Sequence, residues 1–281
     1  MNALNSTRPK ILRKPGALLL VAGLIFGCEL YAQESGLVAK RAKPNIVLIL
    51  VDDMGFSDIG CYGGEVNTPH LDRLAENGLR FTNMYNTSKC FPSRACLLTG
   101  VYAQQCGMNR SSKGIKNAIT MADLLRTEGY RTLAVGKHHS NNSLHDRGFD
   151  RFYGFHYGLG KSCANHFNPG QKRSGEGVPA RKKGESRAYC FDDRKMLPYY
   201  TPKEKNWYTT DYFTKWAIDF LEEYKNEDKP YFLYVSYTAP HANNALAQKT
   251  RNGMEVPDNA FPYAGERWPR PERNKAAMIT R

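Results

Sequence analysis

The apolar positions along the chain form two patterns. Continuous apolar runs are typical of buried strands, and apolar residues at helical spacing are typical of amphipathic helices. The run PNIVLILVDD, residues 44–53, is almost continuously apolar until two aspartates end it. Such a run favours a strand that is covered on both faces, as in a parallel sheet flanked by helices. RTLAVG (131–136), PYFLYVSY (230–237) and LRFTNMY (79–85) are the other strand candidates.

Helical spacing of apolar residues predicts four helices. They cover TPHLDRLAENG (68–78), PSRACLLTG (92–100), TMADLLRTEG (120–129) and TDYFTKWAIDFLEEYK (210–225). Thr68 is a candidate cap in front of Pro69, and Thr120 with Asp123 has the spacing of a capping box. Strands that alternate with helices predict an α/β fold with a mostly parallel central sheet and right-handed crossovers.

The N-terminus has a composition of its own. Arg8, Lys10, Arg13 and Lys14 precede the apolar stretch GALLLVAGLIFGC, which ends at Cys28. This stretch is too short and too poorly flanked for a permanent membrane span, so we expect a signal peptide over residues 1–33 and a polar linker over residues 34–43. The prediction is an exported protein, periplasmic or extracellular, with no stable membrane span. Cleavage before Cys28, which would leave a lipid-anchored cysteine, is the alternative to simple export.

Lys and Arg outnumber Asp and Glu by 40 to 27, which gives the 281-residue chain a formal net charge of +13. Such an excess is compatible with a nucleic acid, an acidic surface or an anionic substrate. The basic residues gather in residues 8–14, 171–187 and 267–281 without the interleaved aromatics of a single-strand-binding face. We therefore expect solvated basic segments and no nucleic-acid partner. Residues 156–206, rich in Gly, Lys, Arg, Pro and Tyr, predict a basic, loop-rich insertion.

Polar side chains follow three of the predicted strands directly. These are Asp52 and Asp53, the stretch from Lys137 to His139, and His241 after Pro240. Ligands of parallel sheets bind outside the carboxyl ends of the strands, so these side chains are expected on one rim.

Each of these rim groups has two interpretations. Adjacent carboxylates repel unless a cation lies between them, so Asp52 and Asp53 suggest a calcium or magnesium site, although a turn or a helix cap also explains them. Lys137, His139 and His241 are ordinary residues when taken singly. Together with Arg94 near a helix start they suggest an anion site.

The chain has seven cysteines and no C-x-x-C pair, so a zinc ribbon is not indicated. They are Cys28, Cys61, Cys90, Cys96, Cys106, Cys163 and Cys190. An even set of six would remain after removal of the signal peptide, which permits disulfides without specifying them. Cys90 stands out because it begins CFPSRACLLTG, where an apolar helical run starts.

The segment CFPSR, followed by LLTG, matches a C-x-P-S-R…L-x-T-G signature, and with it the chain resembles the type I, formylglycine-dependent sulfatases of the arylsulfatase branch. PNIVLILVDDMGFSDIGCYGG, TPHLDRLAENGLRFTNMY, GYRTLAVGKHHS, RGFDRFYGF and YTAPH resemble further segments of that family in the same order. The similarity runs from about Pro44 to Ala242, with gaps through the insertion. It implies an alkaline-phosphatase-like α/β/α sandwich.

The resemblance also implies a function for Cys90, namely oxidation to formylglycine by a separate formylglycine-generating enzyme. The hydrated aldehyde would attack the sulfur of an aryl or carbohydrate sulfate ester with one hydroxyl and release sulfate when the other loses its proton. By the same resemblance, Asp52, Asp53 and the modified Cys90 would bind calcium, with magnesium as the alternative ion.

The remaining roles are also implied by the resemblance. Arg94 would hold the formylglycine and steady the metal-binding carboxylates. Lys137 and His241 would hold sulfate oxygens as negative charge develops on them, and His139 would assist deprotonation of the second hydroxyl.

The chain departs from the family pattern in one important respect. The D-N-G segment that completes the family's metal shell does not occur, and Asp258–Asn259 is followed by Ala260. Residues 44–281 are therefore expected to form a sulfatase N-terminal catalytic domain whose C-terminal part is missing. Two alternatives stay open, namely a truncated non-catalytic sulfatase fragment and a phosphatase or phosphodiesterase of the alkaline-phosphatase-like group. The latter group generally uses a serine or threonine nucleophile with zinc.

Overall fold

The computed structural model describes residues 42–111, 113–155, 166, 190–197, 208–242, 256, 263 and 266–280. Residues 44–281 form one compact unit, which is the part discussed below. The predicted signal peptide with Cys28, nearly all of the linker, most of the insertion and Asp258–Asn259 lie outside the described residues. No helix within the described ranges has the length and apolar character that a bilayer crossing requires.

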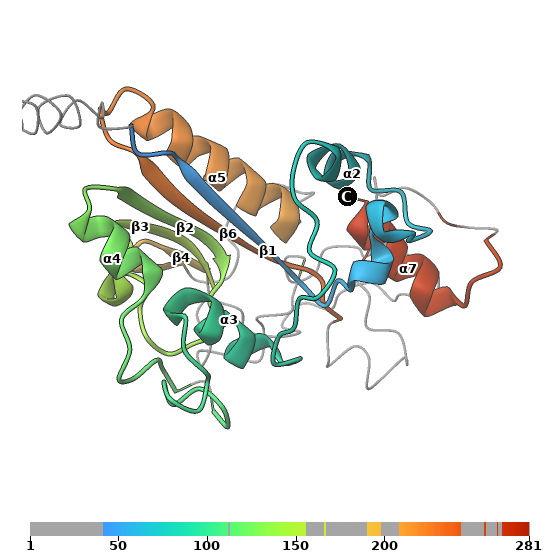
Figure 1. Ribbon diagram of the computed structural model, residues 1–281, viewed down its shortest axis with the longest axis horizontal. Helices are drawn as coiled ribbons and strands as arrows, with labels where there is room; N and C mark the ends of the chain where they lie inside the picture. The colour runs from blue at the N-terminus through green and yellow to red at the C-terminus, as the bar shows by residue number, and fades with distance from the viewer. Residues whose placement is uncertain are drawn as a thin grey trace, which may run out of the picture. The chain divides into compact units, whose positions relative to one another are not determined.

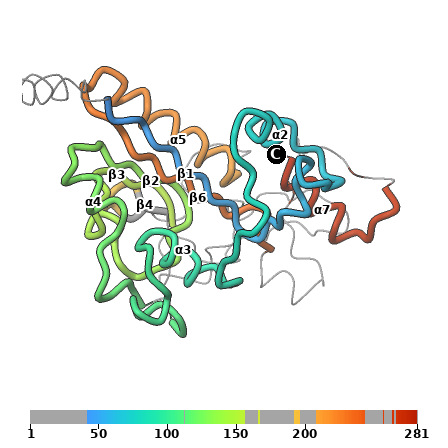
Figure 2. Tube along the Cα trace, viewed as in Figure 1, coloured from blue at the N-terminus to red at the C-terminus, as the bar shows by residue number. Residues whose placement is uncertain are grey.

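A six-stranded sheet runs through the unit in the order β1-β6-β2-β3-β4-β5 (Figure 1). Its strands are β1 (Ile46–Asp52), β2 (Arg131–Lys137), β3 (Arg151–Phe155), β4 (Cys190–Asp192), β5 (Lys195–Leu197) and β6 (Tyr231–Pro240). Neighbours among β1, β6, β2 and β3 are parallel, and β4 and β5 extend the sheet antiparallel. In Figure 2 the blue β1 and the orange β6 run side by side, although they are far apart in the sequence. The predicted α/β fold with a mostly parallel sheet is confirmed.

The central strands β2 and β6 are apolar along most of their length because helices cover both of their faces. Alternate residues of β2 and β6, Leu133 with Val135 and Leu233 with Val235, pack against α5 (Thr209–Tyr224). The intervening Ala134, Phe232 and Tyr234 pack on the other face against residues of α3 (Cys90–Thr99) and α4 (Met121–Thr127). This period of two gives a helix–sheet–helix arrangement, visible in Figure 1.

The helix predictions hold, with one difference at a cap. In α4, Thr120 Oγ1 accepts a hydrogen bond from the Asp123 amide at 3.1 Å, and Asp123 Oδ2 accepts one from the Thr120 amide at 2.8 Å, which is the predicted capping box. Thr68 precedes α2 (Pro69–Glu76) but makes no side-chain cap. Its hydroxyl instead accepts a hydrogen bond from the Gly60 amide at 2.9 Å.

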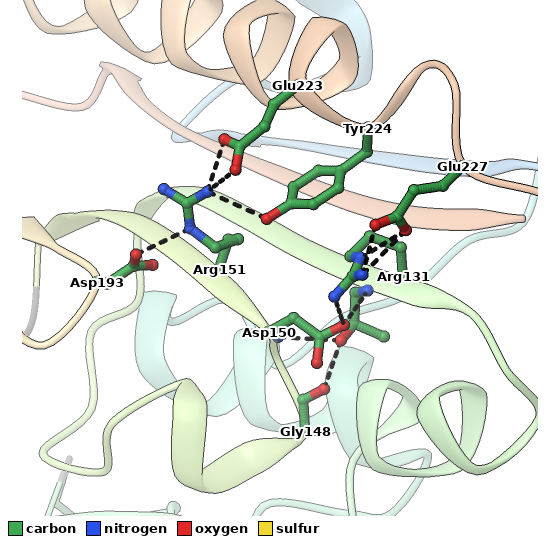
Figure 3. Close-up of polar contacts among 9 residues, drawn as sticks. Arg131, Gly148, Asp150, Arg151, Asp193, Glu223, Tyr224 and Glu227 are labelled. Atoms are coloured by element: carbon green, nitrogen blue, oxygen red, sulfur yellow. Dashed lines mark hydrogen bonds and ion pairs between the residues drawn. The ribbon is translucent and has the colours of Figure 1, made fainter. Parts of the chain in front are cut away.

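Two arginines, at the amino-terminal ends of β2 and β3, hold the last turn of α5 and the residues that follow it against the sheet (Figure 3). Arg131 of β2 donates to the carboxylate oxygens of Glu227 from Nη2, at 2.8 and 2.9 Å, and from Nε, at 3.1 Å. Arg151 of β3 donates to Glu223 at 2.6 Å and to Tyr224 Oη at 3.1 Å. Bidentate pairs of this kind hold two elements in a defined orientation.

The prediction of a strand over residues 79–85 is wrong. The segment has no regular secondary structure, and its apolar side chains face solvent, with Leu79 91% and Tyr85 87% exposed. An apolar segment becomes a strand only where a neighbouring strand pairs with it, and none does so in the described part of the sheet.

β3 and the β4–β5 hairpin were not predicted from the sequence. For α7 (Arg270–Ile279) the sequence offered only the resemblance of NKAAMITR, residues 274–281, to the beginning of a sulfatase-family helix. Residues Ala276–Met278 of α7 pack in a cluster with Tyr263. Three short 3₁₀ turns complete the described elements, η2 (Phe56–Asp58), η3 (Gly60–Tyr62) and η4 (His145–Arg147).

Candidate active site

Three strands end at one rim of the sheet, and each presents a residue that the sequence singled out. β1 ends at Asp52, β2 at Lys137 and β6 at Pro240, directly before His241. Because β6 lies between β1 and β2, with Pro240 in register with Asp52, the three ends are adjacent. His241 Nε2 lies 3.7 Å from Asp53 Oδ2. The structure thus brings the aspartates, Lys137 and His241 together.

At the centre of the rim, one buried carboxylate is shared by two buried cations. Asp52, Arg94 and Lys137 are 6%, 3% and 0% exposed. Lys137 Nζ donates a hydrogen bond to Asp52 Oδ2, and Arg94 Nη2 lies 3.2 Å from the same oxygen. Burial by itself would raise the pKa of Asp52, but the charges of Lys137 and Arg94 outweigh it and lower that pKa below its usual range. The cluster therefore carries one more positive than negative charge in a place of low solvent access, which favours binding of an anion.

Arg94 is held in place by residues of β2 and β6, in addition to its ion pair with Asp52 of β1. From its position on α3 its Nη1 donates to the main-chain oxygen of Lys137 at 2.9 Å and to Ser236 Oγ, and lies 3.5 Å from Tyr234 Oη. Ser236 Oγ in turn donates to the Lys137 oxygen at 2.9 Å. Ser236 and Tyr234 were not predicted from the sequence. β6 also carries the hydroxyl groups of Tyr231, Tyr237 and Thr238, so nothing in the strand's sequence distinguished these two residues.

His139 follows β2 in a left-handed backbone conformation, with φ of 60°, and only 7% of it is exposed. Its ring meets that of Phe91 edge to face at 5.7 Å between centroids. Burial, followed by the charges of Lys137 and Arg94, lowers the pKa of His139 to about 3. The imidazole is therefore neutral at physiological pH, and a neutral imidazole has one ring nitrogen that accepts hydrogen bonds.

Cys90 is the first residue of α3, half-buried and without a disulfide partner in the described residues. It lines a cavity of about 330 Å³ between the end of β1 and the start of α3. The polar lining residues are Asp52, Asp53, Asn86, Ser88, Lys89, Ser93 and Arg94. The thiol and both aspartates thus share one cavity, and Lys137 and His241 contact it through Asp52 and Asp53.

The predicted metal ligands fit a hard cation as a partial shell. Asp52 and Asp53 offer carboxylate oxygens, the donors that calcium and magnesium prefer, and Cys90 lies in the same cavity. Within the described residues, no three His, Cys, Asp or Glu side chains are gathered as a metal cluster. Asp53 is 58% exposed, so water would reach the remaining coordination positions.

This chain is similar to known sulfatases, both by its match to a family model and by its sequence identity to individual proteins. A family model described as Sulfatase matches residues 44–276. Arylsulfatase from Klebsiella aerogenes is 31% identical over 72% of this chain, and arylsulfatase G from Rattus norvegicus is 31% identical over 86% of it. The solved structure of BT4656 in complex with its substrate D-glucosamine-2-N,6-O-disulfate superposes with a TM-score of 0.52 and 31% identity over 71% of this chain and 35% of that one.

The chain is shorter than the proteins that it matches. It covers 44% of the Klebsiella arylsulfatase and 52% of rat arylsulfatase G, about half of their length.

Proposed function

The chain belongs to the sulfatase family, in its arylsulfatase-like part, and from this premise we propose that it hydrolyses aryl or carbohydrate sulfate esters through a formylglycine made from Cys90 and a bound calcium ion, with magnesium as the alternative. The observation that carries the proposal is the buried group of Asp52, Arg94 and Lys137 beside the cavity of Cys90. Its surplus positive charge suits a sulfate ester, which bears one negative charge.

The proposed nucleophile and metal have complementary tasks. When formed, a hydrated formylglycine supplies two hydroxyl groups on one carbon, one to take the sulfuryl group as the alcohol leaves and one to lose a proton as sulfate departs. A bound calcium ion would be held by Asp52, Asp53 and the modified Cys90, and would supply positive charge at the sulfate oxygens.

The remaining residues hold charge and move protons. Lys137 and Arg94 share Asp52 Oδ2, so their charges are fixed in direction before a substrate arrives. In its doubly protonated form His241 would donate from Nε2, which lies 3.7 Å from Asp53 Oδ2, to a sulfate oxygen. His139, neutral because of its lowered pKa, would accept a hydrogen bond from the second hydroxyl and so assist its deprotonation.

The proposal extends to maturation and location. The C-x-P-S-R context of Cys90 supports a formylglycine-generating enzyme as a partner, and the N-terminal basic and apolar segments support export to the periplasm or the extracellular space. A sulfated carbohydrate is supported as a substrate class by BT4656, whose structure contains D-glucosamine-2-N,6-O-disulfate.

Two measurements on protein matured with the formylglycine-generating enzyme test the proposal. Mass spectrometry of the Cys90 peptide should show a product lighter than cysteine, and a model aryl sulfate should release sulfate faster with calcium than after chelation. Cys90→Ala is the control and should abolish release. An unmodified thiol in active protein, or phosphate-ester cleavage without sulfate release, would contradict the proposal.

A further inference from the structure

His166 is a fully buried histidine that lies beside the end of β6, although it is remote from β6 in the sequence. Its Nε2 lies 2.9 Å from the main-chain oxygen of His241, and its Nδ1 lies 3.3 Å from Thr209 Oγ1. The main-chain oxygen of His166 also accepts a hydrogen bond from the Thr209 amide at 3.0 Å. One residue thus joins the start of α5 to the residue that follows β6.

These contacts define the protonation of the His166 ring. A carbonyl oxygen only accepts hydrogen bonds, so Nε2 carries the proton that bonds to the His241 oxygen. In the neutral ring Nδ1 then accepts, and the Thr209 hydroxyl donates to it. The ring also stacks on Tyr208, with 5.8 Å between centroids and 29° between planes. His166 is therefore held at both nitrogens and on one face.

The ring of His241 depends on the main chain that His166 holds. His241 Nδ1 lies 2.6 Å from the main-chain oxygen of Ala242 and donates to it, which turns Nε2 towards Asp53. The His241 amide donates to the Thr238 oxygen at 2.9 Å. On the other side of His241, its carbonyl is held by His166. Without the hydrogen bond from His166, the peptide between His241 and Ala242 would be able to rotate. That rotation would move the Ala242 oxygen, which accepts the hydrogen bond from His241 Nδ1.

We infer that His166 is a positioning residue, which fixes the main chain at His241 so that His241 Nε2 faces Asp53, a residue that lines the cavity of Cys90. The inference rests on the proposed function, because it gives His241 the task of binding a sulfate oxygen. It adds a residue from the insertion to the site and links the start of α5 to sulfate binding. A misplacement of a binding group by about 1 Å is able to reduce catalysis by up to about 100-fold.

Two substitutions separate the hydrogen bond from the packing. His166→Phe keeps a ring for Tyr208 and removes both nitrogens, whereas His166→Gln keeps an N–H donor near the position of Nε2. With a model aryl sulfate, we expect His166→Phe to lower kcat/KM by at least about tenfold. His166→Gln should recover most of that loss. A role in stability alone predicts that the two variants lose activity in proportion to their loss of thermal stability, and that result would overturn the inference.

A second measurement does not depend on activity. The ring resonances of His241, assigned by their absence in His241→Gln, should shift in His166→Phe and stay near their native positions in His166→Gln. Unchanged resonances in His166→Phe would overturn the inference even in an active enzyme. If the native protein releases no sulfate, the proposed function fails while this comparison still tests the positioning role. If His166→Phe does not fold, Thr209→Val replaces it, because it removes the hydroxyl that holds Nδ1, and should shift the same resonances.

Discussion

At the scale of single residues, the site depends on one carboxylate that two buried cations share. Asp52→Asn would leave Lys137 and Arg94 without their counter-ion in a place that water hardly reaches. Loss of one partner from a buried charge cluster typically costs about 3–5 kcal/mol. We expect the free energy of unfolding of Asp52→Asn, measured with urea, to fall by about 3 kcal/mol.

The neighbouring aspartate is the matched control for that change. Asp53 is 58% exposed and its carboxylate lies 3.7 Å from His241, so Asp53→Asn should change the free energy of unfolding by less than about 1 kcal/mol. Equal losses in the two variants would show that Asp52 does not compensate the buried charges of Lys137 and Arg94.

A second residue-scale prediction concerns pH. The unfolded chain protonates His139 near its ordinary pKa of 6.5, whereas the folded protein does so only near 3. The unfolded state therefore binds more protons in this interval, so stability is greatest above about pH 6.5 and falls as the pH is lowered towards 3. The limiting slope for one group is about 1.4 kcal/mol per pH unit.

His139→Asn removes this group and is compatible with the left-handed backbone at position 139, which asparagine tolerates. Urea unfolding between about pH 5 and pH 7.5 should show a smaller pH dependence in His139→Asn than in the native protein. An identical slope in both would mean that His139 is not buried in its neutral form.

The sequence could place the charged residues of the site but not their supports. Asp52, Lys137 and His241 were predictable because each follows a recognisable strand, and strand ends of a parallel sheet meet at one rim. Ser236 and His166 were not, because each acts through a contact across the fold, the first to Arg94 and the second to His241. No local pattern encodes such contacts.

At the scale of elements, the rim depends on a close approach between β2 and β6. Gly136, directly before Lys137, has φ of 108°, and a Cβ there would lie 2.0 Å from the Ser236 oxygen. Gly136→Ala would thus both strain the backbone and push β6 away from β2, at a combined cost of about 3 kcal/mol.

Gly129→Ala is the control for Gly136→Ala. Gly129 also has a left-handed φ, of 84°, but a Cβ there meets nothing within 4 Å, so the control carries only the backbone strain of about 1 kcal/mol. Thermal or urea unfolding of both variants measures the difference. If Gly136→Ala is no less stable than Gly129→Ala, the strands are able to separate at the rim without cost.

Elements were predictable where their own residues determine them. α4 carries its capping box and α5 its apolar stripe, so both were found from the sequence. β3 is short and contains Gly154, and it becomes a strand because β2 pairs with it in register from Leu133 to Lys137. The segment at residues 79–85 shows the reverse case, since its apolar residues meet no pairing strand in the described part of the sheet. Pairing between distant segments, rather than composition, decides such cases.

At the scale of the whole molecule, β1 is an edge strand with an apolar outer surface. In the described sheet it pairs only with β6, and Val47 and Ile49 on it are 50% and 55% exposed. Edge strands of this kind offer unpaired main-chain groups next to apolar side chains, which favours pairing with another chain. We expect the 281-residue chain to self-associate as its concentration rises, which sedimentation velocity measures directly.

A single charge on the edge should weaken that association. Ile49→Lys places an ammonium group on β1, the kind of residue with which natural sheets protect their edges. Ile218→Lys is the control, because Ile218 is 54% exposed but lies on α5. If β1 is the contact, Ile49→Lys shifts the sedimentation boundary towards the monomer at each concentration and Ile218→Lys does so much less. Only Ile49 lies on a strand with unpaired main-chain groups. If both variants shift the sedimentation boundary equally, association is therefore driven by general surface hydrophobicity and not by pairing at β1.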